Sequence, residues 1–183
     1  ARALANLHQT LYRLRRVLGD EVVILQGQEC RLAPGLSLDY DVARFEAQAR
    51  RALAFAPGDW RRLEALASGV ELYTGEYLAD LAVDWALDRR LGLNDLYVRL
   101  LSAYADELMS LTRYAEAREI LTKALAVEEL RDDLHQKMLV CLAGLGRRHE
   151  VVNHYRRYRE TLRTALGLDP PPEMRALYAR LLE

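Results

Sequence analysis

The start of the chain is rich in polar side chains that donate hydrogen bonds. Arg2, Asn6, Gln9, Arg13 and Arg16 recur at intervals that place them on one stripe of a helix. Asn and Gln can each form two hydrogen bonds with adenine and Arg with guanine, while Arg also binds phosphate. Such a stripe would suit the major groove of DNA. A solvated polar face would use the same residues, and charge alone does not decide between the two interpretations.

A helix and a hairpin would have to position these donors. The leucines at positions 4, 7, 11, 14 and 18 predict a helix over 3–18 whose apolar stripe lies opposite the donors, and Gly19 is a suitable end for it. His8 and Tyr12, on the flanks of the leucine stripe, are expected to pack. Two apolar runs, 21–25 and 29–33, predict a β-hairpin that turns at Gln26-Gly27-Gln28.

The charge of the chain is unevenly distributed. The net charge is −1, yet residues 1–19 hold four arginines and no acid, so the rest carries −5. This excludes a uniformly basic nucleic-acid-binding surface and places a local basic field on the first helix. A second cluster of net charge +4 spans 147–163, where Arg147, Arg148, Arg156, Arg157, Arg159 and Arg163 outnumber Glu150 and Glu160. We interpret it as a solvated helix face, with a second DNA contact or an acidic partner as the alternative.

The chain after Asp41 reads as helix throughout. Asp41 and Asp59 are suitable N-caps, and aromatic residues interrupt the pattern at 73–77. The apolar spacing predicts helices over 42–55, 60–72, 84–112 (one helix or two), 114–127, 130–145, 147–166 and 171–182. The aromatic side chains of this region are expected to form core between helices, with a ligand-binding concave groove as the alternative. They are Tyr73, Tyr77, Trp85, Tyr97, Tyr104, Tyr155 and Tyr158.

These helices repeat. A shift of 34 residues superposes Leu100 on Leu134, Leu108 on Leu142, Arg113 on Arg147 and Glu116 on Glu150. Paired helices with this period are typical of tetratricopeptide repeats, in which each pair buries its apolar face against its neighbours. The sequence therefore predicts a helical-repeat domain.

Several kinds of chemistry lack support in the sequence. It contains no Gly-rich phosphate loop, nucleophile elbow, HExxH or CxxC, so we expect a non-enzyme without cofactor or metal. His149 and His154 are five positions apart and diverge by about 140° on a helix, which prevents them from sharing a metal. The acids between Glu128 and Asp133 are explained by a helix start. Cys30 and Cys141 suggest no disulfide framework, and no apolar run is long enough to span a membrane.

Several motifs carry a resemblance to a known family. They are Leu72-Tyr-Thr-Gly-Glu-Tyr-Leu-Ala-Asp-Leu81, Trp85, Gly146-Arg-Arg-His-Glu150, Tyr155-Arg-Arg-Tyr-Arg159 and Leu166-Gly-Leu-Asp-Pro-Pro-Pro-Glu-Met174. Together they resemble the bacterial transcriptional activator domain of the SARP type (Streptomyces antibiotic regulatory protein type), which follows an OmpR-type winged helix-turn-helix. The tail, similar to the family's LGxDPxPE(L/M), is the most specific piece. Leu7 to Gly19 resembles the end of the winged domain's recognition helix.

The resemblance implies a mainly α fold, a tetratricopeptide-like helical domain preceded by a partial winged helix. Residues 1–33 would be the C-terminal part of the winged domain and 34–183 the activator domain. Asn6, Gln9 and Arg13 would then read bases, and Arg2 and Arg16 would contact phosphate. Arg31, in the wing, would reach a phosphate or the minor groove; a salt bridge to Glu29 or Glu21 is the alternative.

The function implied by the resemblance is that of a cytoplasmic DNA-binding transcriptional activator. Its partners would be double-stranded promoter DNA, RNA polymerase and, through the helical domain, a second copy. The alternative is a protein-interaction or sensor module with a vestigial winged helix. The altered wing is its support, since the wing ends Glu29-Cys30-Arg31-Leu32 where the family has Gly-Tyr-Arg-Leu. A second departure from the family is that the winged domain's first strands and helices have no counterpart before Ala1. The resemblance does not identify the operator sequence, an effector ligand or the role of the basic cluster at 147–163.

Overall fold

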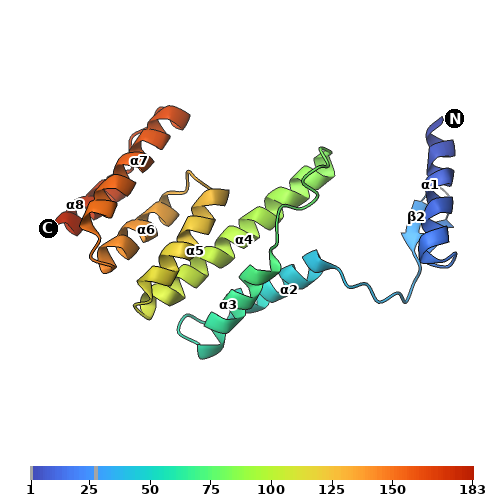
Figure 1. The fold of residues 1–183 in the computed structure, drawn as a ribbon, viewed down its shortest axis with the longest axis horizontal. Helices are drawn as coiled ribbons and strands as arrows, with labels where there is room; N and C mark the ends of the chain where they lie inside the picture. The colour runs from blue at the N-terminus through green and yellow to red at the C-terminus, as the bar shows by residue number, and fades with distance from the viewer. Residues whose placement is uncertain (1, 27–28) are drawn as a thin grey trace. The chain divides into compact units, whose positions relative to one another are not determined.

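A computed structural model describes residues 2–26 and 29–183, with side chains from Asn6 onward. The chain divides after Tyr40 into two compact units, a small one ending there and a larger one spanning Asp41–Glu183. Figure 1 shows their elements. Each unit is described by itself.

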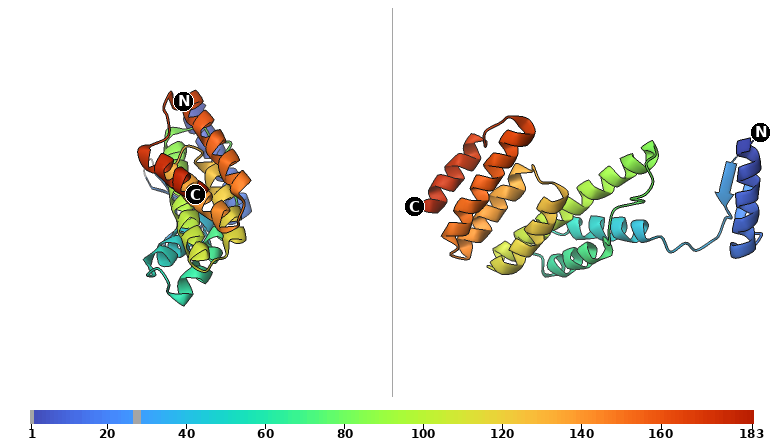
Figure 2. Two further views of the ribbon diagram at one scale, coloured as in Figure 1. Left: turned by 90° about the vertical axis from the view of Figure 1, so that its left-hand side faces the viewer. Right: turned by 45° about the horizontal axis from the view of Figure 1, so that its top comes forward.

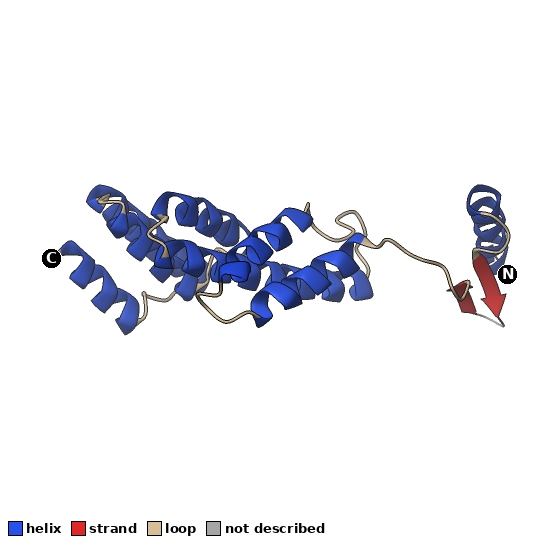
Figure 3. Ribbon diagram, turned by 90° about the horizontal axis from the view of Figure 1, so that it is seen from below, coloured by secondary structure: helices blue, strands red, loops and turns tan. Residues whose placement is uncertain are grey.

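The first unit is one helix and one hairpin. Helix α1 runs from Arg2 to Leu18, and the strands are β1 (Val23–Gln26) and β2 (Glu29–Leu32). The strands pair antiparallel with Val23 opposite Leu32, and they are the two red arrows of Figure 3. Gly19 ends the helix at a φ of +99°, a conformation that glycine adopts without strain. The helix and hairpin predictions are confirmed, while the turn at 27–28 lies outside the described residues.

The apolar stripe of α1 is mostly exposed, which corrects part of the sequence prediction. Among the described side chains of this unit only Leu11 and Val23 are buried, whereas Leu7, Leu14 and Leu18 are 40–49% exposed. The predicted packing of His8 and Tyr12 is wrong, because both are exposed. A single helix against a two-stranded hairpin offers too little surface to cover the whole stripe.

The second unit consists of helices throughout its described length. They are α2 (Asp41–Ala54), α3 (Trp60–Leu72), α4 (Asp84–Ser110), α5 (Tyr114–Val127), α6 (Asp132–Gly144), α7 (Arg148–Leu166) and α8 (Pro172–Leu182). Helices consecutive in sequence lie side by side, as the colour order in Figures 1 and 2 shows. The predicted helices are confirmed, and the long segment after Asp84 is one helix of 27 residues.

A continuous core joins these helices. Phe45 of α2, Leu66 of α3 and Leu100 of α4 are almost wholly buried in it. Gly69 allows this approach, because a Cβ at that position would lie 2.8 Å from a methyl group of Leu100. The core is extended at its other end by Met174 of α8, which is fully buried. The spacing of apolar residues therefore locates the core correctly.

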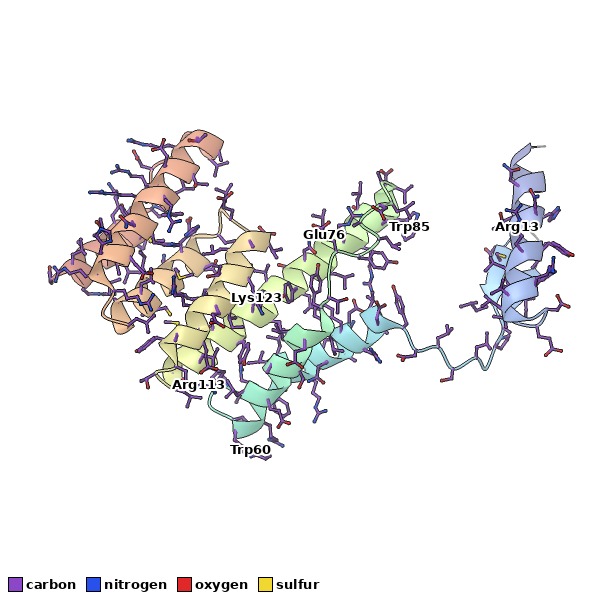
Figure 4. All side chains as sticks on the ribbon, viewed as in Figure 1. Arg13, Trp60, Glu76, Trp85, Arg113 and Lys123 are labelled. Atoms are coloured by element: carbon purple, nitrogen blue, oxygen red, sulfur yellow. The ribbon has the colours of Figure 1, made fainter. Side chains whose placement is uncertain are left out.

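The aromatic side chains belong mainly to this core, as predicted. Tyr97, Tyr155 and Tyr158 are buried, and Tyr73 stacks on Tyr97 with ring centroids 4.0 Å apart. The prediction is wrong for Trp85, which is 59% exposed at the start of α4 (Figure 4). Ala86 is the one buried side chain in the first two turns of that helix, so little surrounds the indole there.

Two turns confirm the 34-residue repeat at atomic detail. Thr112, between α4 and α5, has a φ of +57°, and Gly146, between α6 and α7, has a φ of +70°. The backbone N–H after each turn donates back into the preceding helix: Arg113 to the Leu108 carbonyl at 2.8 Å, and Arg147 to the Leu142 carbonyl at 3.0 Å. Both turns thus end a helix with a left-handed residue.

Replacing Gly146 by alanine is expected to lower the free energy of unfolding by about 1 kcal/mol. A Cβ at this position meets open space, so the cost is the left-handed backbone alone. Chemical denaturation monitored by circular dichroism measures the effect. Gly92→Ala is the matched control: its Cβ also meets open space, but Gly92 lies within α4, where alanine should stabilise by about 0.5–1 kcal/mol. Equal responses of the two variants would contradict the left-handed turn.

Candidate functional site

The polar face of α1 is open to solvent. Asn6, Gln9, Arg13 and Arg16 are all exposed, and Arg13 is marked in Figure 4. Neither Arg13 nor Arg16 forms an ion pair with any residue that the structure describes. The backbone of Arg2 belongs to the helix, while its side chain lies outside the described residues. The helix therefore presents two uncommitted guanidinium groups and two amides along one stripe.

Arg31 lies on β2 and engages an acid of its own strand. Its Nη2 is 2.5 Å and its Nε 3.0 Å from Oε2 of Glu29. Both side chains are about two-thirds exposed, with 63% and 67% of their surface accessible. An exposed ion pair of this kind contributes about 0–1 kcal/mol, so the guanidinium can leave Glu29 for a phosphate at little cost.

Arg15 has a structural role that sequence reasoning missed. Its Nε and Nη2 donate to the Val23 carbonyl at 3.2 and 3.0 Å, which ties α1 to the hairpin. The signal was present in the sequence. At about 100° per residue Arg15 falls on the leucine side of the helix, away from the other arginines.

The second basic cluster is largely a solvated face. Arg147 pairs with Glu150 at 2.9 Å, and Arg163 pairs with Asp169 at 3.0 Å. Arg148, Arg156 and Arg159 are exposed on α7. This distribution agrees with long charged side chains covering a helix surface.

A groove in the second unit is the other candidate site. It has a volume of about 640 Å³ and is lined by α5, α6 and α7 together with Glu129. Helices α5 and α7 do not pack on each other along their described lengths, so α6 is left accessible between them. Three buried α6 side chains, His135, Met138 and Leu142, form its floor. Arg118 of α5 and Glu150 of α7 pair across it at 3.3 Å.

Two histidines meet in this groove. Nδ1 of His135 lies 2.9 Å from Nε2 of His154, and Nε2 of His135 lies 2.7 Å from the Glu129 carbonyl oxygen. A carbonyl only accepts, so neutral His135 carries its proton on Nε2, and its Nδ1 accepts from His154. These contacts assign the Nε2–H tautomer to both rings. Nδ1 of His154 is then an acceptor without a partner among the residues described.

Burial keeps both histidines neutral at physiological pH. Desolvation lowers the pKa of His135, and desolvation together with His135 and Arg157 lowers the pKa of His154 to about 4. Beside them, the Tyr158 hydroxyl donates to Asp132, and burial raises the pKa of Tyr158. Spacing along one helix could not reveal the histidine pair, because its two members lie on different helices. The usable signal is that antiparallel helices joined by a turn at Gly146 bring together residues that lie at similar distances from the turn.

Other kinds of site find no support in the part of the chain that the structure describes. Its acidic, histidine and cysteine side chains form no group of three or more that could hold a metal. Cys30 is exposed, whereas Cys141 is buried and its thiol donates to the Tyr114 carbonyl. Within the same described residues, every helix is too short or too polar to cross a bilayer.

The fold and its surfaces define a class of protein: a tetratricopeptide-like helical domain that follows a helix-and-hairpin unit in the sequence. The chain belongs to the bacterial transcriptional activator domain family, of the SARP type. The family model, described as "Bacterial transcriptional activator domain", matches residues 40–182.

Relatives of this chain are named as regulators. It is 30% identical over 188 residues to the regulatory protein AfsR of Streptomyces griseus, and 26% identical over 200 residues to the transcriptional regulatory protein MoaR1 of Mycobacterium tuberculosis. The matches cover 100% of this chain, 19% of AfsR and 61% of MoaR1. The chain therefore spans about a fifth of AfsR.

A solved structure has the same fold. It is that of EmbR from Mycobacterium tuberculosis in complex with a low-affinity phosphopeptide, with a TM-score of 0.76 and 24% sequence identity. The match covers 98% of this chain and 50% of that chain. The mainly helical fold with its small hairpin is thereby confirmed.

Proposed function

We propose that this protein is a cytoplasmic DNA-binding transcriptional activator and not an enzyme. Residues 1–33 act as the C-terminal part of a winged helix, with α1 as recognition helix, and 34–183 act as the activator domain. The observation that carries the proposal is the exposed stripe of Asn6, Gln9, Arg13 and Arg16 on α1, directly followed by a hairpin. Membership of a transcriptional activator domain family supports it.

The chemistry of each side chain suggests its role. Asn6, Gln9 and Arg13 read base edges in the major groove, where amides and guanidinium groups form paired hydrogen bonds. Arg2 and Arg16 contact phosphates and set the register. Arg31 leaves Glu29 to reach a phosphate or the minor groove beside the wing.

The helical unit serves protein partners in this proposal, either RNA polymerase or a second copy of the chain. Exposed apolar side chains support this role, since Leu87 and Leu91 lie one turn apart on the same face of α4 and are 40% and 67% exposed. Contiguous exposed apolar residues commonly mark protein interfaces.

The DNA-binding role is tested by fluorescence anisotropy of the full-length protein, measured on promoter duplexes across a series of salt concentrations. We expect affinity to fall steeply with salt. Arg13→Ala should lose about 1–3 kcal/mol of discrimination between promoter and unrelated DNA, because Arg13 reads a base. Arg16→Ala should weaken binding to all sequences alike and reduce the salt slope by about 1.

Arg180→Ala is the control, since it removes the same charge from an exposed position on α8. Equal, weak binding by the wild type, Arg13→Ala and Arg180→Ala at every salt concentration would refute the DNA-binding role. It would favour the alternative of a protein-interaction module whose winged helix is vestigial.

A further inference from the structure

The groove between α5 and α7 combines an apolar floor with a small number of polar groups. Met138 and Leu142 on its floor are 5% and 3% exposed, and Leu125 of α5 adds apolar surface. A volume of about 640 Å³ is in the range of small-molecule sites. The apolar surface would accommodate the hydrocarbon body of a ligand.

The charged side chains that line the groove are two arginines and three acids, and one of these arginines, Arg157, offers a place for a negative charge on that ligand. Arg157 lines the groove, is exposed, and forms no ion pair with the residues that the structure describes. Glu150, which also lines the groove, is committed to Arg147 at 2.9 Å and Arg118 at 3.3 Å. Arg157 is thus available to pair with an anion, whereas the charge of Glu150 is already neutralised by its two arginine partners.

The histidine pair can take up one proton without losing a hydrogen bond. His154 already donates from Nε2 to His135, so an added proton goes to its Nδ1. Burial and the charge of Arg157 oppose that proton in the empty groove. An anion held between Arg157 and His154 would offset both effects and accept a hydrogen bond from the new Nδ1–H.

We propose that this groove binds a small organic anion with an apolar body, such as a carboxylate or phosphate ester, through Arg157 and His154. Binding draws one proton from solvent to Nδ1 of His154. Affinity therefore increases as the pH falls from neutral towards 5. The site lies wholly in the second unit and does not depend on DNA binding by α1, so the two proposals fail independently.

Other ionisable groups surround the pair and enter the pH dependence. They are Arg118 on α5, Glu129 before α6, Asp132 and Asp133 on α6, and Glu150 and Glu160 on α7. Among them, Asp132 accepts from Tyr158 and Asp133 pairs with Arg131 at 2.9 Å, so both are engaged as carboxylates. Carboxylates with an ordinary pKa titrate below the range in which histidine does. A phosphate ester itself titrates at about pH 6, so the proton taken up there is assigned to the histidines from the titration with hexanoate.

The test titrates the 183-residue chain with hexanoate and hexyl phosphate, which share the proposed chemistry. Hexanamide controls for the apolar body and acetate for the charge. Calorimetry in buffers of different ionisation enthalpy counts the protons taken up, and NMR follows the pKa of His154. We expect hexanoate or hexyl phosphate to bind about tenfold more tightly than either control. With that ligand bound, the pKa of His154 should rise by about two units, from about 4 to about 6, which produces the increase in affinity between neutral pH and about pH 5.

Two variants and one control assign the site. Arg157→Gln should weaken binding about tenfold, and His154→Gln should abolish the proton uptake. Arg156→Gln is the control, because Arg156 is exposed on the same helix and does not line the groove. The proposal is overturned by no saturable binding of either anion, by equal binding of hexanoate and hexanamide, or by equal effects of Arg156→Gln and Arg157→Gln.

Discussion

Glu107→Ala is expected to lower the free energy of unfolding of the helical unit by about 3–5 kcal/mol. Glu107 is a buried acid of α4, and its Oε1 lies 3.0 Å from Nε of Arg62, also nearly buried. Nε has no well-aligned acceptor among the residues described, so the contact is an ion pair rather than a linear hydrogen bond. Removing the carboxylate leaves the guanidinium buried and uncompensated.

The same carboxylate fixes the loop between α2 and α3. Both of its oxygens accept from the Gly58 N–H, at 3.3 and 3.4 Å, and Arg62 donates in turn to the Phe55 carbonyl. Because Gly58 is exposed, water can replace this acceptor, and losing the hydrogen bond costs only about 0.5–1.5 kcal/mol more. The loss on removing Glu107 is therefore shared between α4 and this loop.

Urea denaturation of three variants separates these effects. Glu64→Gln, at an exposed position of α3, should change stability by less than about 0.5 kcal/mol. The double replacement Arg62→Met with Glu107→Leu should recover much of the loss, because no unpaired charge remains. A Glu107→Ala protein as stable as Glu64→Gln would show that the pair contributes nothing.

Acid is expected to destabilise the helical unit through His154. The pKa of this group falls from its ordinary 6.5 to about 4 on folding, so between these values the unfolded chain binds a proton that the folded chain does not. Stability is therefore lost as the pH drops from about 7 to about 4, by up to about 3 kcal/mol. Burial lowers the pKa of His135 too, which acts in the same direction.

His154→Gln should flatten this acid dependence while preserving the neutral contact, since the glutamine amide can donate to Nδ1 of His135 as the imidazole does. His149→Gln is the matched control, because His149 is exposed on the same helix. The measurement is the free energy of unfolding at about pH 7 and about pH 4.5. A loss in His154→Gln as large as in His149→Gln would rule out the buried pair as its cause.

Helices were predictable in this chain because their apolar residues recur at regular spacing. The repeat was predictable as well, since Leu108 and Leu142 occupy equivalent positions and the paired turns follow. Thr112 was not recognisable as a left-handed residue, because threonine rarely adopts that conformation. The left-handed conformation of Thr112 is indicated only by its position, because Gly146 occupies the equivalent place 34 residues later.

Contacts between helices were much harder to predict. Arg62 pairs with Glu107 and His135 with His154, and in each pair the residues lie on different helices. Periodicity shows on which face of its helix a residue lies, but not which residue of another helix it contacts. The exposure of Trp85 and Tyr12 was missed because an apolar side chain does not reveal how much surface is available to cover it. The DNA-contacting roles of Asn6, Gln9, Arg13, Arg16 and Arg31 stay predictions.

The length of α4 has a consequence for cooperativity. Repeat arrays often behave as one-dimensional chains of nearest-neighbour modules, whose ends can fray while the middle stays folded. At 27 residues α4 is about 40 Å long, and it packs against α2 and α3 as well as α5 and α6. No boundary between modules falls within it. The helices that pack against α4 on either side are therefore expected to fold and unfold together, as a single cooperative unit.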